Sequence, residues 1–355
     1  MVKYKKISVL IIFHNEERTL RETLQNVFLM DYPKELIEVV CVDDGSTDMS
    51  ATIARQFPVI LIEQKRSWLS GAYNAGIEQC TGDYILKLDA HMYLKNKDTF
   101  KIINEYFLTS DKIAGVCGTY VSLKDNDRNF VRDIRRLTIF KKNHQFLDIN
   151  LGNFTTWSSA IGAYKREIFE TNQFPEEFVN SYGEDIYLQI ILHNQGYNFI
   201  YTPEIVGIHD AAIDNRQLLK KMEYEIKAAG NILLKASSTR AIEVPYLHYF
   251  LSYPLLSIIL LSISIVVPYM LILFVTVCFI FEVIPALEVF KVRQYSFKKR
   301  SITCCYLIIK ELIQAIYLPL YIFKKSKSIK QFITVFLIII KWEAQKFGLS
   351  RMVLD

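Results

Sequence analysis

The stretch Gly82-Asp83-Tyr84-Ile85-Leu86-Lys87-Leu88-Asp89-Ala90-His91 predicts how the first part of the chain is organised. Its apolar run, Tyr84 to Leu88, is broken only by Lys87 and stops at a carboxylate, a small residue and an imidazole. Such a run is typical of a buried parallel strand, and open α/β sheets bind ligands at the carboxyl ends of their strands. On an extended chain Asp89 and His91 would share one face, which suits a divalent cation. A strand that merely ends in polar residues is the alternative.

Three more apolar runs precede this stretch and alternate with helical patterns. The expected strands are Ile7–Phe13, Ile37–Val42 and Val59–Ile62. Helical spacing covers 18–29, a second helix runs through Ala54, and a third contains the small residues of Gly71–Gly76. This strand and helix order predicts a doubly wound, mostly parallel sheet. Neither GxGxxG nor GxxxxGK[ST] occurs, so a classical dinucleotide fold and a P-loop NTPase are not supported.

Carboxylates follow two other expected elements. Asp43 and Asp44 come directly after the second strand and open the run Asp43–Asp48. A plain turn is the alternative there, with Thr47 or Asp48 capping the next helix. Glu184-Asp185 opens a helical pattern that ends near Asn194. A helix amino terminus favours charged carboxylates, although simple capping explains the pair as well.

The composition divides the chain into two parts. Of its 355 residues 51% are hydrophobic, the mean hydropathy is +0.16 and the net charge is +5. The apolar excess lies beyond Pro245, and Tyr246 to Phe281 contains no Lys, Arg, Asp or Glu. We therefore expect a soluble domain over 1–240 and a membrane-associated helical region over 241–355. No basic block with interleaved aromatic residues suggests nucleic-acid binding.

Three segments of the second part are expected to meet the membrane. A transmembrane hairpin is expected at about 246–287, an amphipathic or membrane helix at about 302–323, and a short apolar helix at about 331–341. Three or four spans are an alternative, and a buried helical domain is another. Lys and Arg clusters flank these segments, and positive flanks prefer the cytoplasm. The six cysteines lack CxxC spacing, which is typical of reduced thiols in a protein that faces the cytosol. We therefore expect a cell-membrane protein whose domain over 1–240 faces the cytoplasm.

Four motifs in order carry a resemblance to family 2 glycosyltransferases over about residues 7–235. They are Phe13-His14-Asn15-Glu16, Asp43–Asp48, Gly71–Gly76 and Gly82–His91. The resemblance implies an α/β GT-A nucleotide-diphospho-sugar transferase fold, Rossmann-like, with a mostly parallel mixed sheet. The family usually has Asp where this chain has His91. The Asp-Ala-His version resembles the branch similar to succinoglycan-type exopolysaccharide glucosyltransferases.

The resemblance also implies roles for individual residues. The residues expected to bind the nucleotide sugar are Phe13, Asn15, Glu16, Asp43, Asp44, Gly71, Asn74 and Asp89. Asp89 and His91 would hold a divalent metal, Mn²⁺ or Mg²⁺, with an imidazole shifting the preference toward Mn²⁺. His209 either joins them or lies on a surface loop. Within the catalytic pair, Glu184 would stand beside Asp185, the general base. Gly162 and Arg216 would lie on the acceptor or phosphate side.

The function implied is that of an inverting glycosyltransferase. A sugar would pass from a nucleotide-diphospho-sugar, most readily a UDP-sugar, to a hydroxyl of a lipid-linked saccharide in exopolysaccharide, capsule or cell-surface glycan biosynthesis. A direct displacement with one base inverts the anomeric centre. The Gln-x-x-Arg-Trp motif of processive synthases is absent, so one sugar is expected per acceptor encounter. The alternatives are a polyprenyl-phosphate sugar synthase and a non-catalytic scaffold of a polysaccharide assembly complex.

Overall fold

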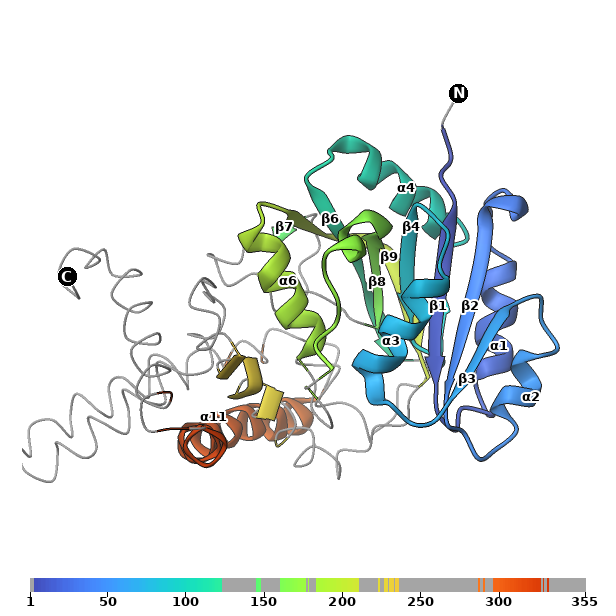
Figure 1. Ribbon diagram of the computed structural model, residues 1–355. Helices are drawn as coiled ribbons and strands as arrows, with labels where there is room; N and C mark the ends of the chain where they lie inside the picture. The colour runs from blue at the N-terminus through green and yellow to red at the C-terminus, as the bar shows by residue number, and fades with distance from the viewer. Residues whose placement is uncertain are drawn as a thin grey trace, which may run out of the picture.

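The protein is described here by a computed structural model. It describes residues 3–122, 145–147, 160–176, 183–210 and 296–326, together with single positions at 178, at 328 and 331, and between 223 and 290. Arg216 lies outside the described residues, as do the expected hairpin at 246–287 and the short helix at 331–341, apart from terminal positions. The described part is layered, with one twisted sheet between two sets of helices (Figure 1).

The first half of the sheet is parallel, as the sequence predicts. Its strands are β1 (Ile7–Phe13), β2 (Ile37–Asp44), β3 (Ile60–Gln64) and β4 (Tyr84–Leu88), in the order β3-β2-β1-β4. The connecting helices are α1 (Leu20–Phe28), α2 (Ser50–Ala54) and α3 (Trp68–Gln79), and a short 3₁₀ turn, η1 (Lys34–Leu36), precedes β2. The carboxyl ends of these four strands therefore point the same way.

The second half of the sheet is mixed. Its strands are β8 (Ile161–Lys165), β6 (Ile113–Ser122), β9 (Asn198–His209), β5 (Met92–Leu94) and β7 (Gln145–Leu147). β8 runs antiparallel to both β4 and β6, β9 is parallel to β6, and β5 and β7 pair antiparallel with β9. The expectation of a mostly parallel sheet is thus wrong for this half, because β8 enters between β4 and β6 in the opposite direction.

Separate hydrophobic cores lie on the two faces of the sheet. One packs α1, α2 and α4 (Thr99–Thr109) against the strands through residues such as Leu24, Ile53 and Phe100. The other packs α3 and α6 (Glu184–Asn194), with Tyr73 and Leu188 among its buried residues. A further 3₁₀ turn, η4 (Arg166–Glu170), follows β8. The carboxyl ends of β1, β2 and β4 therefore lie between the helices of the two cores.

Gly76 sets how closely α3 approaches the sheet. A methyl group added at this position would lie 2.3 Å from Cδ1 of Leu10 and 2.9 Å from Cγ2 of Val42. Only a residue without a side chain allows this contact. The small residues in α3 therefore serve helix–sheet packing here.

A long helix, α11 (Phe297–Lys325), contains the helix expected at 302–323. Cys304 and Ile322 are buried, and Ile322 belongs to the core that contains α6. The exposed large apolar side chains of α11 are Phe297, Ile302, Ile313, Tyr317, Leu320 and Phe323. Across the described residues, no helix combines the length and apolar character that crossing a bilayer requires. The membrane-associated region stays a prediction.

The described cysteines include buried thiols and one exposed thiol. Burial raises the pKa of Cys41 and of Cys80 to about 12. Cys305, on α11, is exposed. The cysteines within the described ranges are free thiols.

Candidate active site

The Asp89-Ala90-His91 segment is a turn between two strands. β4 ends at Leu88, β5 begins at Met92, and the Met92 N–H donates to the Asp89 carbonyl at 3.0 Å. The Thr23 hydroxyl donates to the Ala90 carbonyl at 2.8 Å and fixes the turn to α1. The expected extended conformation is therefore wrong. The chain must turn here because β5 leaves β4 to pair with β9 on the far side of the sheet.

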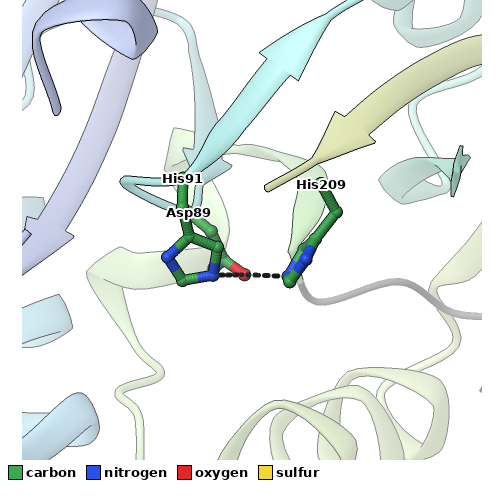
Figure 2. A group of neighbouring side chains, drawn as sticks. All are labelled: Asp89, His91 and His209. Atoms are coloured by element: carbon green, nitrogen blue, oxygen red, sulfur yellow. Dashed lines mark ion pairs between the residues drawn. The ribbon is translucent and has the colours of Figure 1, made fainter. Parts of the chain in front are cut away.

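The turn nevertheless brings its two ligand candidates together with a third. Asp89 Oδ2 lies 3.8 Å from His91 Nε2 and 3.9 Å from His209 Nε2, and the two imidazole rings meet edge to face at 4.6 Å between centroids (Figure 2). The three ligand atoms lie within 4.8 Å of one another. His209 is the last residue of β9 and is buried, so the surface-loop alternative is wrong.

The chemistry of this group suits a divalent transition metal. Ligand atoms bound at about 2.1 Å stand roughly 3–4 Å apart around one ion. The distances from Asp89 Oδ2 fall in that range. One carboxylate oxygen with two imidazole nitrogens favours Mn²⁺ or a similar ion over Mg²⁺, which prefers oxygen ligands. Asp89, His91 and His209 thus form a candidate metal centre.

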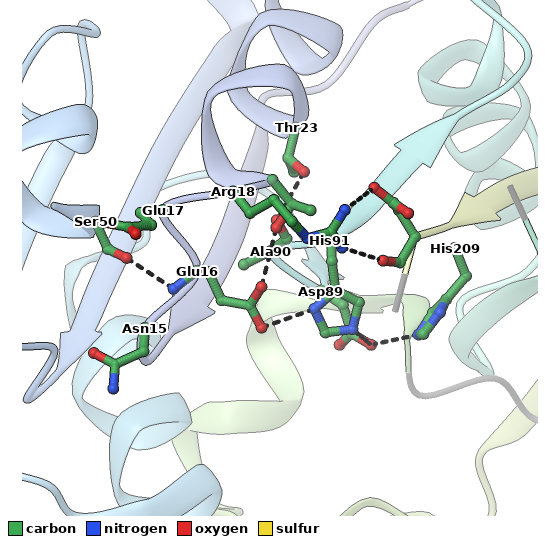
Figure 3. A network of polar contacts seen from close by, with 12 residues as sticks. Asn15, Glu16, Glu17, Arg18, Thr23, Ser50, Asp89, Ala90, His91 and His209 are labelled. Atoms are coloured by element: carbon green, nitrogen blue, oxygen red, sulfur yellow. Dashed lines mark hydrogen bonds and ion pairs between the residues drawn. The ribbon is translucent and has the colours of Figure 1, made fainter. Parts of the chain in front are cut away.

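Glu16 orients one of these imidazoles. Its Oε1 lies 3.0 Å from Nδ1 of His91, and its Oε2 accepts a hydrogen bond from the Thr19 hydroxyl at 3.0 Å (Figure 3). The bond at Nδ1 leaves Nε2 facing Asp89, an arrangement common behind metal-binding histidines. Burial lowers the pKa of His91, but the Glu16 hydrogen bond and the Asp89 charge outweigh it and raise the pKa overall. The structure thus places Glu16 behind a ligand of the candidate metal centre, a role that the sequence did not indicate.

Asp44 and Asp43 lie at the end of β2, buried beneath the adjoining loop. Asp44 Oδ1 accepts from the Ser67 N–H at 2.6 Å and from Gln64 Nε2 at 3.0 Å, while Oδ2 accepts from the Trp68 N–H at 3.1 Å. Asp44, which is far from α3 in sequence, therefore caps the amino terminus of that helix. Asp43 Oδ1 accepts from the Ser46 N–H at 2.7 Å. A carboxylate oxygen accepts two bonds, so Asp44 Oδ2 keeps capacity for a ligand.

Asn15 links the loops after β1 and β2. Its N–H donates to the Ser46 hydroxyl at 3.0 Å, and its Oδ1 accepts from the Thr47 N–H at 2.8 Å. Asn15 has φ of 58°, and Trp68 at the start of α3 has φ of 64°. Within the described residues these are the non-glycine positions with positive φ, and such strain often gathers at functional sites.

The four other candidates differ in their surroundings. Phe13 is buried in the core, so its ring does not line an open site. A methyl group at Gly71 would meet only the Ser67 side chain within the contact range. Asn74 is buried, and its amide bonds the backbone of Phe174. Gly162 lies opposite Lys87 across the β4–β8 ladder.

Glu184 and Asp185 form the first turn of α6 and are both buried. The helix follows Gly183, whose φ of 122° excludes other residues, and a methyl group there would lie 3.0 Å from Ala228 Cβ. Burial and the charge of Asp185 raise the pKa of Glu184 to about 7. Burial also raises the pKa of Asp89, and the Asp185 charge adds to that effect. The acidic pair and the metal centre therefore lie within electrostatic reach.

One contact that supports the site was missed at the sequence level. Arg18 Nη1 bonds Asp210 Oδ2 at 2.8 Å, and the Asp210 N–H donates to the His91 carbonyl at 2.9 Å. Arg18 and Asp210 are 192 positions apart, so no local pattern could reveal the pair. Lys87 was noted only as an interruption of an apolar strand, yet it is fully buried.

Comparison with known proteins identifies the class of enzyme. Residues 8–172 match the family model described as Glycosyl transferase family 2. The chain therefore carries a family 2 glycosyltransferase domain and is an enzyme of that class, as the motifs predicted.

Curated relatives come from archaea and bacteria. A dolichyl N-acetyl-alpha-D-glucosaminyl phosphate 3-beta-D-2,3-diacetamido-2,3-dideoxy-beta-D-glucuronosyltransferase of Methanococcus voltae is 25% identical over 76% of this chain and 86% of its own length. A poly-beta-1,6-N-acetyl-D-glucosamine synthase of Staphylococcus aureus is 26% identical over 56% of this chain. That alignment spans about half of the synthase, 48% of its length.

Solved structures show the same fold. The mannosyltransferase PcManGT of Pyrobaculum calidifontis, in complex with GDP-Man and Mn²⁺, has a TM-score of 0.54 and 18% identity over 89% of this chain and 88% of its own. TarS 1-349 of S. aureus, in complex with UDP, has a TM-score of 0.51 and 16% identity over 97% of this chain and 92% of its own. The chain thus has a GT-A-like α/β fold with a mixed sheet.

Proposed function

We propose that this enzyme is an inverting, metal-dependent glycosyltransferase that moves a sugar from a nucleotide-diphospho-sugar to a hydroxyl of a lipid-linked saccharide. The observation that carries the proposal is the Asp89, His91 and His209 centre, which directly follows the carboxyl end of β4. Asp185 is buried in the first turn of α6, and its charge adds to the rise in the pKa of Asp89. An in-line displacement needs the metal centre, on the donor side, and the base, on the acceptor side, on opposite sides of the anomeric carbon.

Asp185 is proposed as the general base. It would take the proton of the acceptor hydroxyl while that oxygen bonds to the anomeric carbon and the bond to the diphosphate breaks. The bonding electrons leave with the nucleoside diphosphate. One displacement inverts the anomeric centre, so no second carboxylate nucleophile is needed.

The donor side is proposed to lie between the loops after β1, β2 and β4. Asp44 Oδ2 retains capacity to accept a hydrogen bond from the nucleoside. Asp89, His91 and His209 would hold a divalent cation, which when bound neutralises charge on the diphosphate. Glu16 keeps the His91 ring turned toward that position through Nδ1.

A lipid-linked acceptor is favoured by two observations. The M. voltae relative is named for a dolichyl-linked saccharide phosphate. Helix α11 exposes large apolar side chains between the basic residues Lys298, Lys299 and Arg300 at one end and Lys324 and Lys325 at the other. We propose that α11 lies in the cytoplasmic membrane interface and that the catalytic domain works on that side. The pathway proposed is assembly of a cell-surface glycan.

The test is transfer by the full-length protein with a panel of nucleotide sugars and membrane-extracted lipid acceptors. We expect Asp185→Asn to lower kcat by about 10²- to 10⁴-fold, the usual contribution of a general base, while nucleotide binding persists. Asp111→Asn, which changes an exposed aspartate, is the matched control and should keep full activity. Transfer that survives Asp185→Asn would refute the base assignment.

The same assay separates the alternatives. Transfer to bare polyprenyl phosphate, without a prior sugar, would favour a polyprenyl-phosphate sugar synthase. A protein that binds nucleotide sugars but transfers to no acceptor in the extract would favour a scaffold of an assembly complex.

A further inference from the structure

Lys87 is a buried cation in an apolar strand. Its side chain is 1% exposed, and within the described residues its Nζ has no hydrogen-bond partner. Its neighbours Leu86 and Leu88 belong to the core on the α1 face, whereas Ile85 belongs to the core on the α3 and α6 face. Because side chains alternate along a strand, Lys87 points toward α3 and α6. A buried ammonium costs free energy unless nearby charge or polar groups compensate it.

Aromatic rings enclose the Lys87 ammonium. Nζ lies 3.8 Å from the centroid of the Tyr73 ring and 4.7 Å from that of Phe174. Gly162, directly opposite on β8, leaves space on the same face of the sheet. Asn74 holds the Phe174 segment, accepting from the Phe174 N–H at 2.9 Å and donating to its carbonyl at 3.0 Å. The enclosure is thus built from α3, β8 and the segment before α6.

Two buried carboxylates lie on the same face of the sheet. Glu184 and Asp185 form the first turn of α6, which shares one core with Tyr73 and Phe174. The charge of Lys87 opposes the rise in the pKa of Glu184 that burial causes. Lys87 therefore places a cation on the α6 side of the sheet, two residues before Asp89.

We propose that Lys87 is a positioning residue, the countercharge that allows Glu184 and Asp185 to lie together, buried, at the start of α6. Aromatic faces hold the ammonium in place without neutralising it, so its charge remains available to the carboxylates. The catalytic part of this inference rests on the proposed transferase function. The electrostatic part does not.

The first test needs no substrate. Unfolding of purified Lys87→Met and Lys87→Arg is followed between pH 5 and pH 8, with Lys165→Met as control. Lys165 is also buried, on the adjacent strand β8, but its Nζ donates to the carbonyls of Ser110 and Asp111. We expect Lys87→Met to lose stability relative to Lys87→Arg as the pH rises and Glu184 ionises. Lys165→Met should show no such trend. A loss that is the same at every pH would mean that Lys87 only fills space.

A double variant keeps the test decisive if Lys87→Met folds poorly. Adding Glu184→Gln to Lys87→Met removes one of the charges left without a counterion, so it should recover much of the stability at pH 8. Recovery that is equal at pH 5 and pH 8 would contradict the proposal.

The second test uses transfer kinetics. We expect Lys87→Met to lower kcat at least tenfold with the donor KM within threefold, and Lys87→Arg to restore most of kcat. Unchanged kcat in folded Lys87→Met would overturn the catalytic part. If the wild-type enzyme transfers no sugar, the proposed function fails, while the pH dependence of unfolding still decides the role of Lys87.

Discussion

Glu16 is the residue on which the geometry of the metal centre depends most directly. Its carboxylate holds Nδ1 of His91, so only Nε2 faces Asp89 and His209. We expect Glu16→Gln to weaken Mn²⁺ binding by about 10- to 100-fold, as loss of such partners does in other sites. Electron paramagnetic resonance titration with Mn²⁺ at pH 8 measures this without substrate.

The neighbouring Glu17 provides the control for that measurement. Its Oε2 accepts a hydrogen bond from the Met49 N–H at 3.0 Å. Glu17→Gln should bind Mn²⁺ as the wild type does. Equal affinities of the two variants would show that Glu16 does not support the metal centre.

Glu184 predicts a particular dependence of stability on pH. Burial and the charge of Asp185 raise its pKa from 4.5 to about 7, so the folded state holds the proton more tightly than the unfolded state. Ionisation therefore costs stability progressively from about pH 4.5 to pH 7. Glu184→Gln should be more stable than the wild type at pH 8, by a free energy on the order of 3 kcal/mol, and similar to it at pH 4.5.

Chemical denaturation at several pH values measures the Glu184 effect. Glu105→Gln, on the exposed face of α4, is the control and should give no trend with pH. A stability difference for Glu184→Gln that is flat across this range would contradict the raised pKa.

The local sequence could predict some of these residues and not others. Asp89 follows a buried strand and Asp185 lies at the start of a helix. The residues around each of them indicate these positions. The contact of Glu16 with His91 spans 75 positions and that of Asn74 with Phe174 spans 100. Such pairings depend on the finished fold, so no local pattern reveals them.

At the scale of elements, α3 shows how a glycine determines helix position. Alanine at Gly76 would overlap Leu10 and Val42, whereas alanine at Gly71, on the same helix, would meet only the Ser67 side chain. We expect Gly76→Ala to destabilise the protein by about 1–3 kcal/mol through overpacking. Gly71→Ala should cost less, because Ser67 can rotate away and alanine favours helix. Thermal unfolding of the two variants compares them directly, and equal melting temperatures would contradict this account.

The parallel elements were predictable and the antiparallel ones were not. Strands β1 to β4 each carry a compact apolar run and are joined by helices, which implies parallel pairing. β9 begins with the apolar run of Phe199 to Tyr201 and continues through Pro203, a residue that disfavours strands, to His209. Its partners β6 and β5 lie far away in sequence, and tertiary pairing extends the strand beyond its apolar start.

At the scale of the whole molecule, we expect the protein to contact a lipid surface through α11. Its exposed apolar residues lie between basic ends, a composition typical of interfacial helices. In vesicles containing anionic lipid and nitroxide-labelled lipid, we expect a fluorophore at Leu320→Cys to be quenched. The same label at Leu29→Cys, an equally exposed leucine beyond α1, should remain unquenched.

Attachment of the fluorophore is selective because four of the native thiols are buried, those of Cys41, Cys80, Cys117 and Cys304. Burial also raises the pKa of Cys41 and of Cys80 to about 12. Cys278 and Cys305 are replaced by serine in both variants. Equal quenching at the two positions, or none at either, would contradict an interfacial location for α11.

The position of His209 at the end of β9 also has a consequence for synthesis on the ribosome. Asp89 and His91 leave the ribosome more than a hundred residues before the third ligand does. Among the described strands, β5 pairs only with β9, so the turn that carries Asp89 and His91 has no β partner on that side until β9 emerges. The nascent domain therefore cannot complete its candidate metal centre before β9 emerges, so an ion held there would be captured late in the folding of the domain rather than early.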